Sequence, residues 1–113
     1  MESRPLISII MAVKDTGPYL AECLDSILMQ TYENWELIAV NDHSSDDSWE
    51  RLNDYAQQDD RIRIFQSTGH RLNPALKEGY QYCRGTLINR MDSDDCMPSD
   101  KLEAMFDVWA VHG

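Results

Sequence analysis

Basic residues are scarce in this 113-residue chain, and two common phosphate-binding signatures are missing from it. Lys and Arg number 10 against 20 Asp and Glu, so the formal net charge is −10 at pH 7. Such an acidic chain is poorly suited to sequence-independent nucleic-acid binding, in which Lys and Arg neutralise phosphates. Neither GxGxxG nor GxxxxGK[ST] occurs. Their absence argues against a dinucleotide oxidoreductase and against a P-loop nucleotidase.

Cysteine is sparse as well, and no long apolar run is present. The three cysteines, Cys23, Cys83 and Cys96, are odd in number and lack CxxC spacing, which argues against a disulfide framework and a structural zinc site. No apolar run approaches the ~20 residues that span a bilayer, and the first residues lack the features of a signal peptide. We therefore expect a cytoplasmic protein, in which any membrane association comes from regions outside this segment.

Apolar, β-branched runs alternate along the chain with apolar residues at helical spacing. The pattern predicts strands at residues 6–13, 35–40, 61–65 and 86–91, of which the third lies nearer a sheet edge. Four helices are expected. The first ends near Gln30, the second includes Trp49 to Ala56, and the last two cover 74–83 and 99–111. This order indicates an α/β fold, a Rossmann-like three-layer sandwich with a mainly parallel sheet and right-handed crossovers.

Several local features refine these predictions. Ser44 or Ser45 is expected to cap the second helix. The third helix is expected to turn Leu76, Tyr80 and Cys83 inward, and Gly85 stands where a C-terminal helix glycine is usual.

Polar residues follow three of the predicted strands. In an open parallel sheet, ligands bind at the carboxyl ends of the strands. Here these ends are 12–15, 41–42 and 92–95, and two of them are acidic beyond what loop composition requires.

The most informative segment is Asp92-Ser93-Asp94-Asp95. Its three carboxylates repel one another unless a cation is bound, and hard oxygen ligands suit Mg²⁺ or Mn²⁺. Such an ion would neutralise the charge that develops on a leaving diphosphate. The alternative is a solvated acidic turn that caps the last helix. An EF-hand does not fit, since its glycine and its twelfth-position glutamate are missing.

Asp42 and Arg71 each allow two interpretations. Asp42 could accept hydrogen bonds from a base or ribose, as acidic residues at this place do in dinucleotide-binding folds, or it could serve as a helix cap. Arg71 could grip two phosphate oxygens, or it could be an exposed loop arginine.

Taken together, these segments resemble the inverting family 2 glycosyltransferases. The resemblance rests on Pro5–Asp15, on Tyr19-Leu20 and Ser26–Ile38, on Val40–Asp46, and on Gly85–Ile88, Met91–Asp95 and Asp100–Glu103. It covers nearly the whole chain, with the motifs in the expected order. It implies the A-type glycosyltransferase fold, a UDP- or GDP-sugar as donor, a divalent metal, and a carbohydrate or glycolipid acceptor.

The resemblance also implies roles for individual residues. Ala12, Val13 and Lys14 would line the base pocket, partly through backbone groups. Asp42 would bind the base or ribose side. Asp94 would contact the ribose or diphosphate side and contribute to the metal site, and Asp95 would ligate the metal.

The chain departs from the family pattern at Asn41, at His43 and at Lys14-Asp15, which affects base preference and loop shape. The family's acceptor site and general base follow the metal motif. We therefore expect residues 1–113 to be the N-terminal nucleotide-sugar-binding part, with the base beyond residue 113. Alternatives are a nucleotide-binding fragment without transfer activity and another metal-assisted nucleotidyltransferase. A truncated sheet also predicts self-association through an exposed edge.

Overall fold

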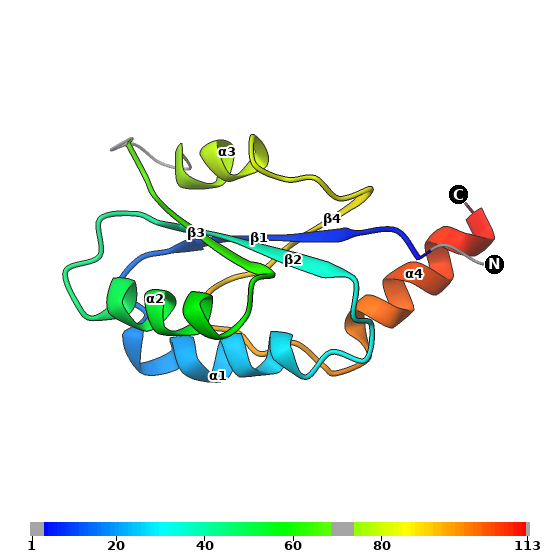
Figure 1. Cartoon of the computed structure of the whole chain (residues 1–113), viewed down its shortest axis with the longest axis horizontal. Helices are drawn as coiled ribbons and strands as arrows, with labels where there is room; N and C mark the ends of the chain where they lie inside the picture. The colour runs from blue at the N-terminus through cyan, green and yellow to red at the C-terminus, as the bar shows by residue number, and fades with distance from the viewer. Residues whose placement is uncertain (1–3, 69–73, 113) are drawn as a thin grey trace.

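The computed structural model describes residues 4–68 and 74–112, which form one parallel sheet with helices on both faces (Figure 1). The elements alternate strictly along the chain. Their bounds are β1 Ile7–Val13, α1 Gly17–Leu28, β2 Trp35–Asn41, α2 Ser48–Gln58, β3 Ile62–Gln66, α3 Pro74–Tyr80, β4 Leu87–Arg90 and α4 Lys101–His112. The predicted α/β class and element order are confirmed.

The four strands lie in the order β3-β2-β1-β4, and every neighbouring pair is parallel. The two central strands, β1 and β2, are almost completely buried, as their continuous apolar sequences predict. Strand β3 lies at one edge, as its alternating sequence indicates, and β4 lies at the other. Because β1 and β2 are central, the loops that follow them are neighbours at the middle of the sheet's carboxyl end.

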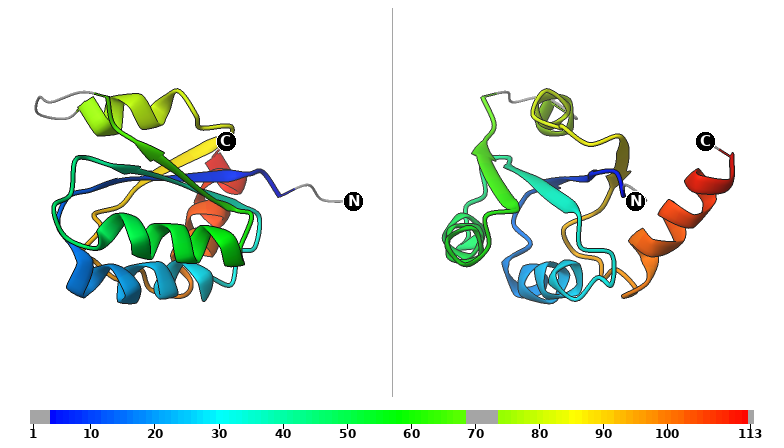
Figure 2. Two further views of the ribbon diagram at one scale, coloured as in Figure 1. Left: turned by 60° about the vertical axis from the view of Figure 1, so that its left-hand side comes forward. Right: turned by 45° about the vertical axis from the view of Figure 1, so that its right-hand side comes forward.

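The helices divide between the two faces of the sheet. Helices α1 and α2 lie together on one face, and α3 covers the other (Figures 1 and 2). The larger core lies under α1 and α2, and the start of α4 contributes Leu102 and Phe106 to it. The smaller core, beneath α3, centres on Ile38, Val40 and Ala75. Within the described residues, no helix is long and apolar enough to cross a membrane.

Two details of the third helix differ from the prediction. Helix α3 ends at Tyr80, before Cys83, and Tyr80 is half exposed, while Ala75 and Gly79 face the sheet. A Cβ at position 79 would come within 2.9 Å of Ile10 Cδ1 on β1, so a glycine allows this close contact. The close approach of α3 to the sheet therefore favours small residues, and Tyr80 turns outward, whereas Cys83 packs against the smaller core as predicted.

Gly85 serves a different purpose from the one predicted. It does not adopt a positive φ, as a left-handed helix-ending glycine does. A Cβ at this position would lie 2.6 Å from the backbone nitrogen of Ser8 and 2.7 Å from the carbonyl oxygen of Leu6. Position 85 therefore requires a residue without a side chain, because the chain that enters β4 passes directly against β1.

A buried carboxylate ties the amino ends of the strands together. Glu36, on β2, is 2% exposed and accepts hydrogen bonds from Ser8 Oγ at 2.6 Å and from the backbone N–H of Arg84 at 2.7 Å. Its other carboxylate oxygen contacts the Arg63 and Arg84 guanidinium groups. Burial acts to raise the pKa of Glu36, but the hydrogen bonds from Ser8, Arg84 and Arg63 outweigh it, and the pKa is lowered.

Candidate functional site

The three polar segments picked out in the sequence lie at one end of the sheet. Asp42 follows β2 and Asp92 follows β4, so the two residues lie on either side of the end of β1. The backbone N–H of Asp42 donates to the carbonyl oxygen of Val13 at 2.7 Å, which extends the β1–β2 pairing into the loops. The parallel sheet thus brings together loops that are far apart in sequence.

The loops after β1 and β2 are clasped by their own side chains. One carboxylate oxygen of Asp15 accepts hydrogen bonds from the backbone N–H groups of Ser45 at 2.6 Å and Asp46 at 3.2 Å. In return, the backbone N–H of Asp15 donates to Ser44 Oγ at 3.0 Å, and that of Gly17 donates to the Asp46 carboxylate at 3.0 Å. Each loop therefore fixes the backbone of the other.

Two residues of these loops adopt left-handed backbone conformations, Asp15 with φ 51° and His43 with φ 56°. Aspartate tolerates this region better than most residues with a Cβ. Both residues lie in the loops that follow the central strands at the carboxyl end of the sheet.

The capping prediction for α2 is wrong in detail. Helix α2 begins at Ser48, and the Asp46 carboxylate accepts hydrogen bonds from the Ser48 N–H at 2.9 Å and from the Ser48 hydroxyl at 2.6 Å. These bonds lower the pKa of Asp46. Ser44 and Ser45 contact the β1 loop instead, through Asp15. Asp42 lies well before α2, so it does not cap that helix.

The residues predicted to line a base pocket differ in what they can offer. Val13 is fully buried and its carbonyl oxygen accepts the Asp42 N–H, so it supports the site from behind, and Ala12 is half-buried against the core beneath α3. The Lys14 ammonium donates to the carbonyl oxygen of His43 at 3.0 Å. Lys14 therefore bridges the two loops in this structure.

The acidic cluster presents its carboxylates on the surface. Asp92, Asp94 and Asp95 are exposed, and each can supply an oxygen atom such that the three atoms lie within 4.8 Å of one another. This donor set fits Mg²⁺ or Mn²⁺, which prefer oxygen ligands and commonly keep coordination positions for water and phosphate. Ser93 is different, because its side chain is only 5% exposed and turns inward.

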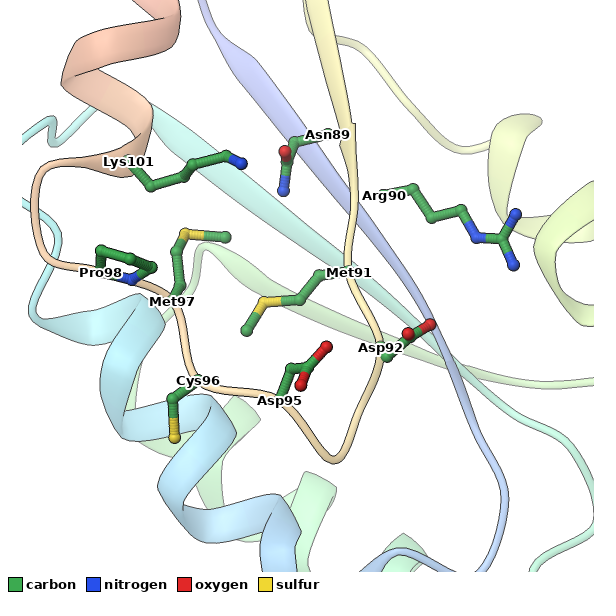
Figure 3. Close-up of a pocket in the computed structure, with 9 residues that line it drawn as sticks. All are labelled: Asn89, Arg90, Met91, Asp92, Asp95, Cys96, Met97, Pro98 and Lys101. Atoms are coloured by element: carbon green, nitrogen blue, oxygen red, sulfur yellow. The ribbon is translucent and has the colours of Figure 1, made fainter.

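A pocket of about 350 Å³ adjoins the cluster (Figure 3). The Asp95 side chain lies beside Met91 on one side of it, and Lys101, at the start of α4, reaches across toward Asn89. The pocket thus combines carboxylate, amide and ammonium groups. Such a lining suits a polar molecule larger than a metal ion.

Cys23 lies behind the cluster, on α1, and its thiol donates to the carbonyl oxygen of Asp92 at 3.7 Å. Burial, followed by the negative charges of Cys96 and of the acidic cluster, raises the pKa of Cys23 to about 12. The thiol is therefore neutral near pH 7 and is not a nucleophile.

Sequence reasoning missed the residues that fix the loops, and one predicted residue lies outside the described part of the chain. Arg71, the phosphate candidate, is outside the described residues. The loop clasp of Asp15, Ser45 and Asp46 and the buried Ser93 were not singled out as positioning groups. Left-handed backbone at Asp15 was not readable from the sequence, although Ser and Asp near helix starts often bind backbone N–H groups.

The fold and the sequence both have close counterparts among known proteins. The profile of glycosyl transferase family 2 matches residues 8–113. The uncharacterized glycosyltransferase EpsJ of Bacillus subtilis is 41% identical over 95 residues, which are 84% of this chain and 28% of EpsJ. The glycosyltransferase GlyG of Streptococcus pneumoniae is 36% identical over 102 residues, which are 89% of this chain and 34% of GlyG.

Solved structures share the fold at lower identity. The crystal structure of S. aureus TarS 1-349 matches with a TM-score of 0.85 at 20% identity, over 94% of this chain and 32% of that one. Mannosyltransferase PcManGT from Pyrobaculum calidifontis was solved in complex with GDP-Man and Mn²⁺. It matches with a TM-score of 0.80 at 21% identity, over 94% of this chain and 32% of that one. The chain spans about a third of these relatives, and it belongs to glycosyl transferase family 2.

Proposed function

We propose that this chain is the donor-binding part of a glycosyltransferase that uses a nucleotide-diphosphate sugar together with Mg²⁺ or Mn²⁺. The observation that carries the proposal is the exposed triad of Asp92, Asp94 and Asp95, whose carboxylate oxygens can converge beside a polar pocket. Family membership supports the reaction class. The bound GDP-Man and Mn²⁺ of PcManGT support the pairing of donor and metal.

In this proposal, the loops divide the donor between them. Asp42, Ala12 and Lys14 bind the base and ribose, with the buried Val13 behind them, and Arg71 contacts a phosphate. Asp95 ligates the metal, while Asp94 contributes to the metal site and to the ribose or diphosphate side. When bound, the metal neutralises the charge on the departing diphosphate. The Asp15 clasp supports this arrangement, since it fixes the loop that carries Asp42.

Sugar transfer requires a further group beyond those that bind the donor. Transfer with inversion to a carbohydrate or glycolipid hydroxyl requires a base that deprotonates the acceptor. We place that base in a segment outside these 113 residues. The greater length of the relatives leaves room for it.

The decisive experiment is calorimetric titration of UDP and of GDP, each with and without Mn²⁺, into the wild-type chain and into Asp95→Ala. We expect binding that depends on Mn²⁺ and is largely lost in Asp95→Ala. Glu22→Gln, an exposed acidic residue on α1, is a charge-matched control and should bind like the wild type. Binding of equal strength with and without metal would refute the role given to the acidic triad.

Two activity assays, used together with the titrations, test the alternatives. A nucleotide-binding fragment without transfer activity predicts metal-dependent binding here and no sugar transfer by a longer chain that contains the acceptor part. A nucleotidyltransferase predicts release of pyrophosphate from a nucleoside triphosphate. Donor hydrolysis or transfer by residues 1–113 alone would refute the placement of the base elsewhere.

A further inference from the structure

One side of helix α1 holds the segment that carries the acidic triad. Four polar side chains, spread from the start of α1 to just beyond its end, contact this segment. The contacts are Thr16 to Ser93, Cys23 to the Asp92 carbonyl, Ser26 to the Met97 N–H, and Gln30 to the Pro98 carbonyl and the Leu102 N–H. The triad therefore begins a segment that is fixed along its length.

Thr16 is the most unusual member of this set. It occupies the N-cap position of α1, where a threonine hydroxyl ordinarily accepts a hydrogen bond from the helix backbone. Its side chain makes no such bond. The Thr16 hydroxyl lies instead 2.9 Å from Ser93 Oγ, and the first N–H of α1, that of Gly17, is satisfied by the Asp46 carboxylate.

Ser93 completes the contact from within the acidic motif. It is 5% exposed, whereas the carboxylates of Asp92, Asp94 and Asp95 are exposed. A buried hydroxyl between outward-facing carboxylates fixes the direction in which the backbone presents them. Thr16 follows Asp15 directly, so the hydroxyl pair also joins the acidic motif to the clasp between the β1 and β2 loops.

We propose that Thr16 and Ser93 are positioning residues for the metal, and that their hydroxyl contact sets the geometry of the carboxylate triad. This inference rests on the proposed function. Residues behind metal ligands commonly determine affinity by orienting the ligands. Loss of the contact should weaken binding of the metal while leaving recognition of the nucleoside unchanged.

A double-mutant cycle on Mn²⁺ affinity tests the inference. Mn²⁺ binding is measured by electron paramagnetic resonance in the presence of saturating UDP or GDP, whichever the wild type binds more tightly. We expect Thr16→Val and Ser93→Ala each to lower the affinity for Mn²⁺ about 3- to 10-fold. The double variant should lose no more than either single variant, because all three lack the same contact.

Three comparisons separate positioning from general stability. Thr16→Ser keeps the hydroxyl and should retain wild-type Mn²⁺ affinity. Thr86→Val makes the same change at an exposed residue before β4 and should have no effect. Affinity for the corresponding nucleoside, uridine or guanosine, which carries no phosphate, should be unchanged in Ser93→Ala. Thermal unfolding shows that each variant is folded at the temperature of the titration.

The outcomes distinguish this inference from the proposed function. A wild type that binds neither nucleotide in a metal-dependent manner would refute both. A metal-dependent wild type with unchanged Mn²⁺ affinity in the two single variants would refute only the positioning role. Fully additive losses in the double variant would also refute it, because the two hydroxyls would then act separately.

Discussion

The carboxylate of Asp15 accepts a 2.6 Å hydrogen bond from the backbone N–H of Ser45, which joins the loop after β1 to the loop after β2. Asp15 also holds a left-handed conformation, with φ 51°. The side chain of Asp15 therefore joins the two loops at the carboxyl end of the sheet, and its backbone adopts the conformation that goes with this contact.

Replacement of Asp15 should weaken nucleotide binding to a degree that depends on the substitute. Asp15→Ala removes the acceptor and places alanine in a strained conformation, whereas Asp15→Asn keeps an acceptor and tolerates positive φ. We expect Asp15→Ala to lower affinity for UDP or GDP about 3- to 10-fold and Asp15→Asn to have a smaller effect, measured by calorimetry. Equal affinities for the wild type and Asp15→Ala would show that the clasp does not shape the site.

Gly85→Ala should destabilise the fold strongly. The new Cβ would meet backbone atoms of Ser8 and Leu6, which cannot move without disturbing the pairing of β1 with β4. We expect a loss of about 1–3 kcal/mol in the free energy of unfolding, measured by urea denaturation. Gly79→Ala is the matched control, since its Cβ would meet the end of the flexible Ile10 side chain and should cost less. The reverse order would contradict this account of Gly85.

Stability should fall in acid because of Glu36. The folded state lowers the pKa of Glu36, so its contribution is present above the unfolded value of about 4.3 and is lost as pH falls through the folded pKa. Glu36→Gln leaves the Arg63 guanidinium without its buried counter-charge and should cost roughly 3 kcal/mol at pH 7.

The measurement is urea denaturation of the wild type and Glu36→Gln at pH 7 and pH 3. The difference between the two proteins should shrink at the lower pH. Glu22→Gln removes an exposed carboxylate and should change stability by less than about 0.5 kcal/mol. A difference that is the same at both pH values would show that the charge of Glu36 does not stabilise the fold.

Two of the three thiols, Cys96 and Cys23, should react with a disulfide reagent at pH 8 in a fixed order. Cys96 is exposed and lines the pocket beside Asp95, whereas Cys23 is buried and its pKa is raised to about 12. We expect a fast phase that disappears in Cys96→Ser, and a Cys23 that reacts only after unfolding.

Mn²⁺ together with UDP or GDP should slow the fast phase if the nucleotide diphosphate enters this pocket. The wild-type reaction with Mn²⁺ alone provides the reference. An unchanged rate at saturating nucleotide would place the diphosphate away from Cys96.

The edge at β4 should promote self-association. Among the residues that the structure describes, strand β4 pairs only with β1 in the sheet, and Ile88 on it is 45% exposed. Unpaired strand edges readily pair with other chains. We expect a mass above that of the monomer in light scattering at high concentration, and Ile88→Lys should reduce it. Gln57→Lys, which introduces the same side chain at an exposed residue of α2, serves as the control. A strictly monomeric wild type would refute the prediction.

Much of this molecule was predictable from local patterns. The continuous apolar runs of β1 and β2 predicted central, buried strands, and the alternation in β3 predicted an edge. The position of the acidic cluster at the end of a strand predicted its place at the carboxyl end of the sheet. These features depend on residues within one element, so a periodic sequence is sufficient to reveal them.

Other features depended on partners that the sequence does not identify. Gly85 resembled a helix-ending glycine, but its small size is required by β1, which lies far from it in sequence. Glu36 is a charged residue in a buried strand, and only the folded arrangement of Ser8, Arg63 and Arg84 makes its burial acceptable.

The sequence alone therefore determined the alternating α/β order, the buried central strands and the grouping of three carboxylates after one strand, because hydrophobic periodicity and residue type are local properties. Only the tertiary structure decided that the Thr16 hydroxyl reaches Ser93 instead of capping its own helix, and that Asp15 and Asp46 bind the opposite loops. Each of these contacts joins segments brought together by the crossovers of the parallel sheet. Their partners are set by strand order and register, which no single segment encodes.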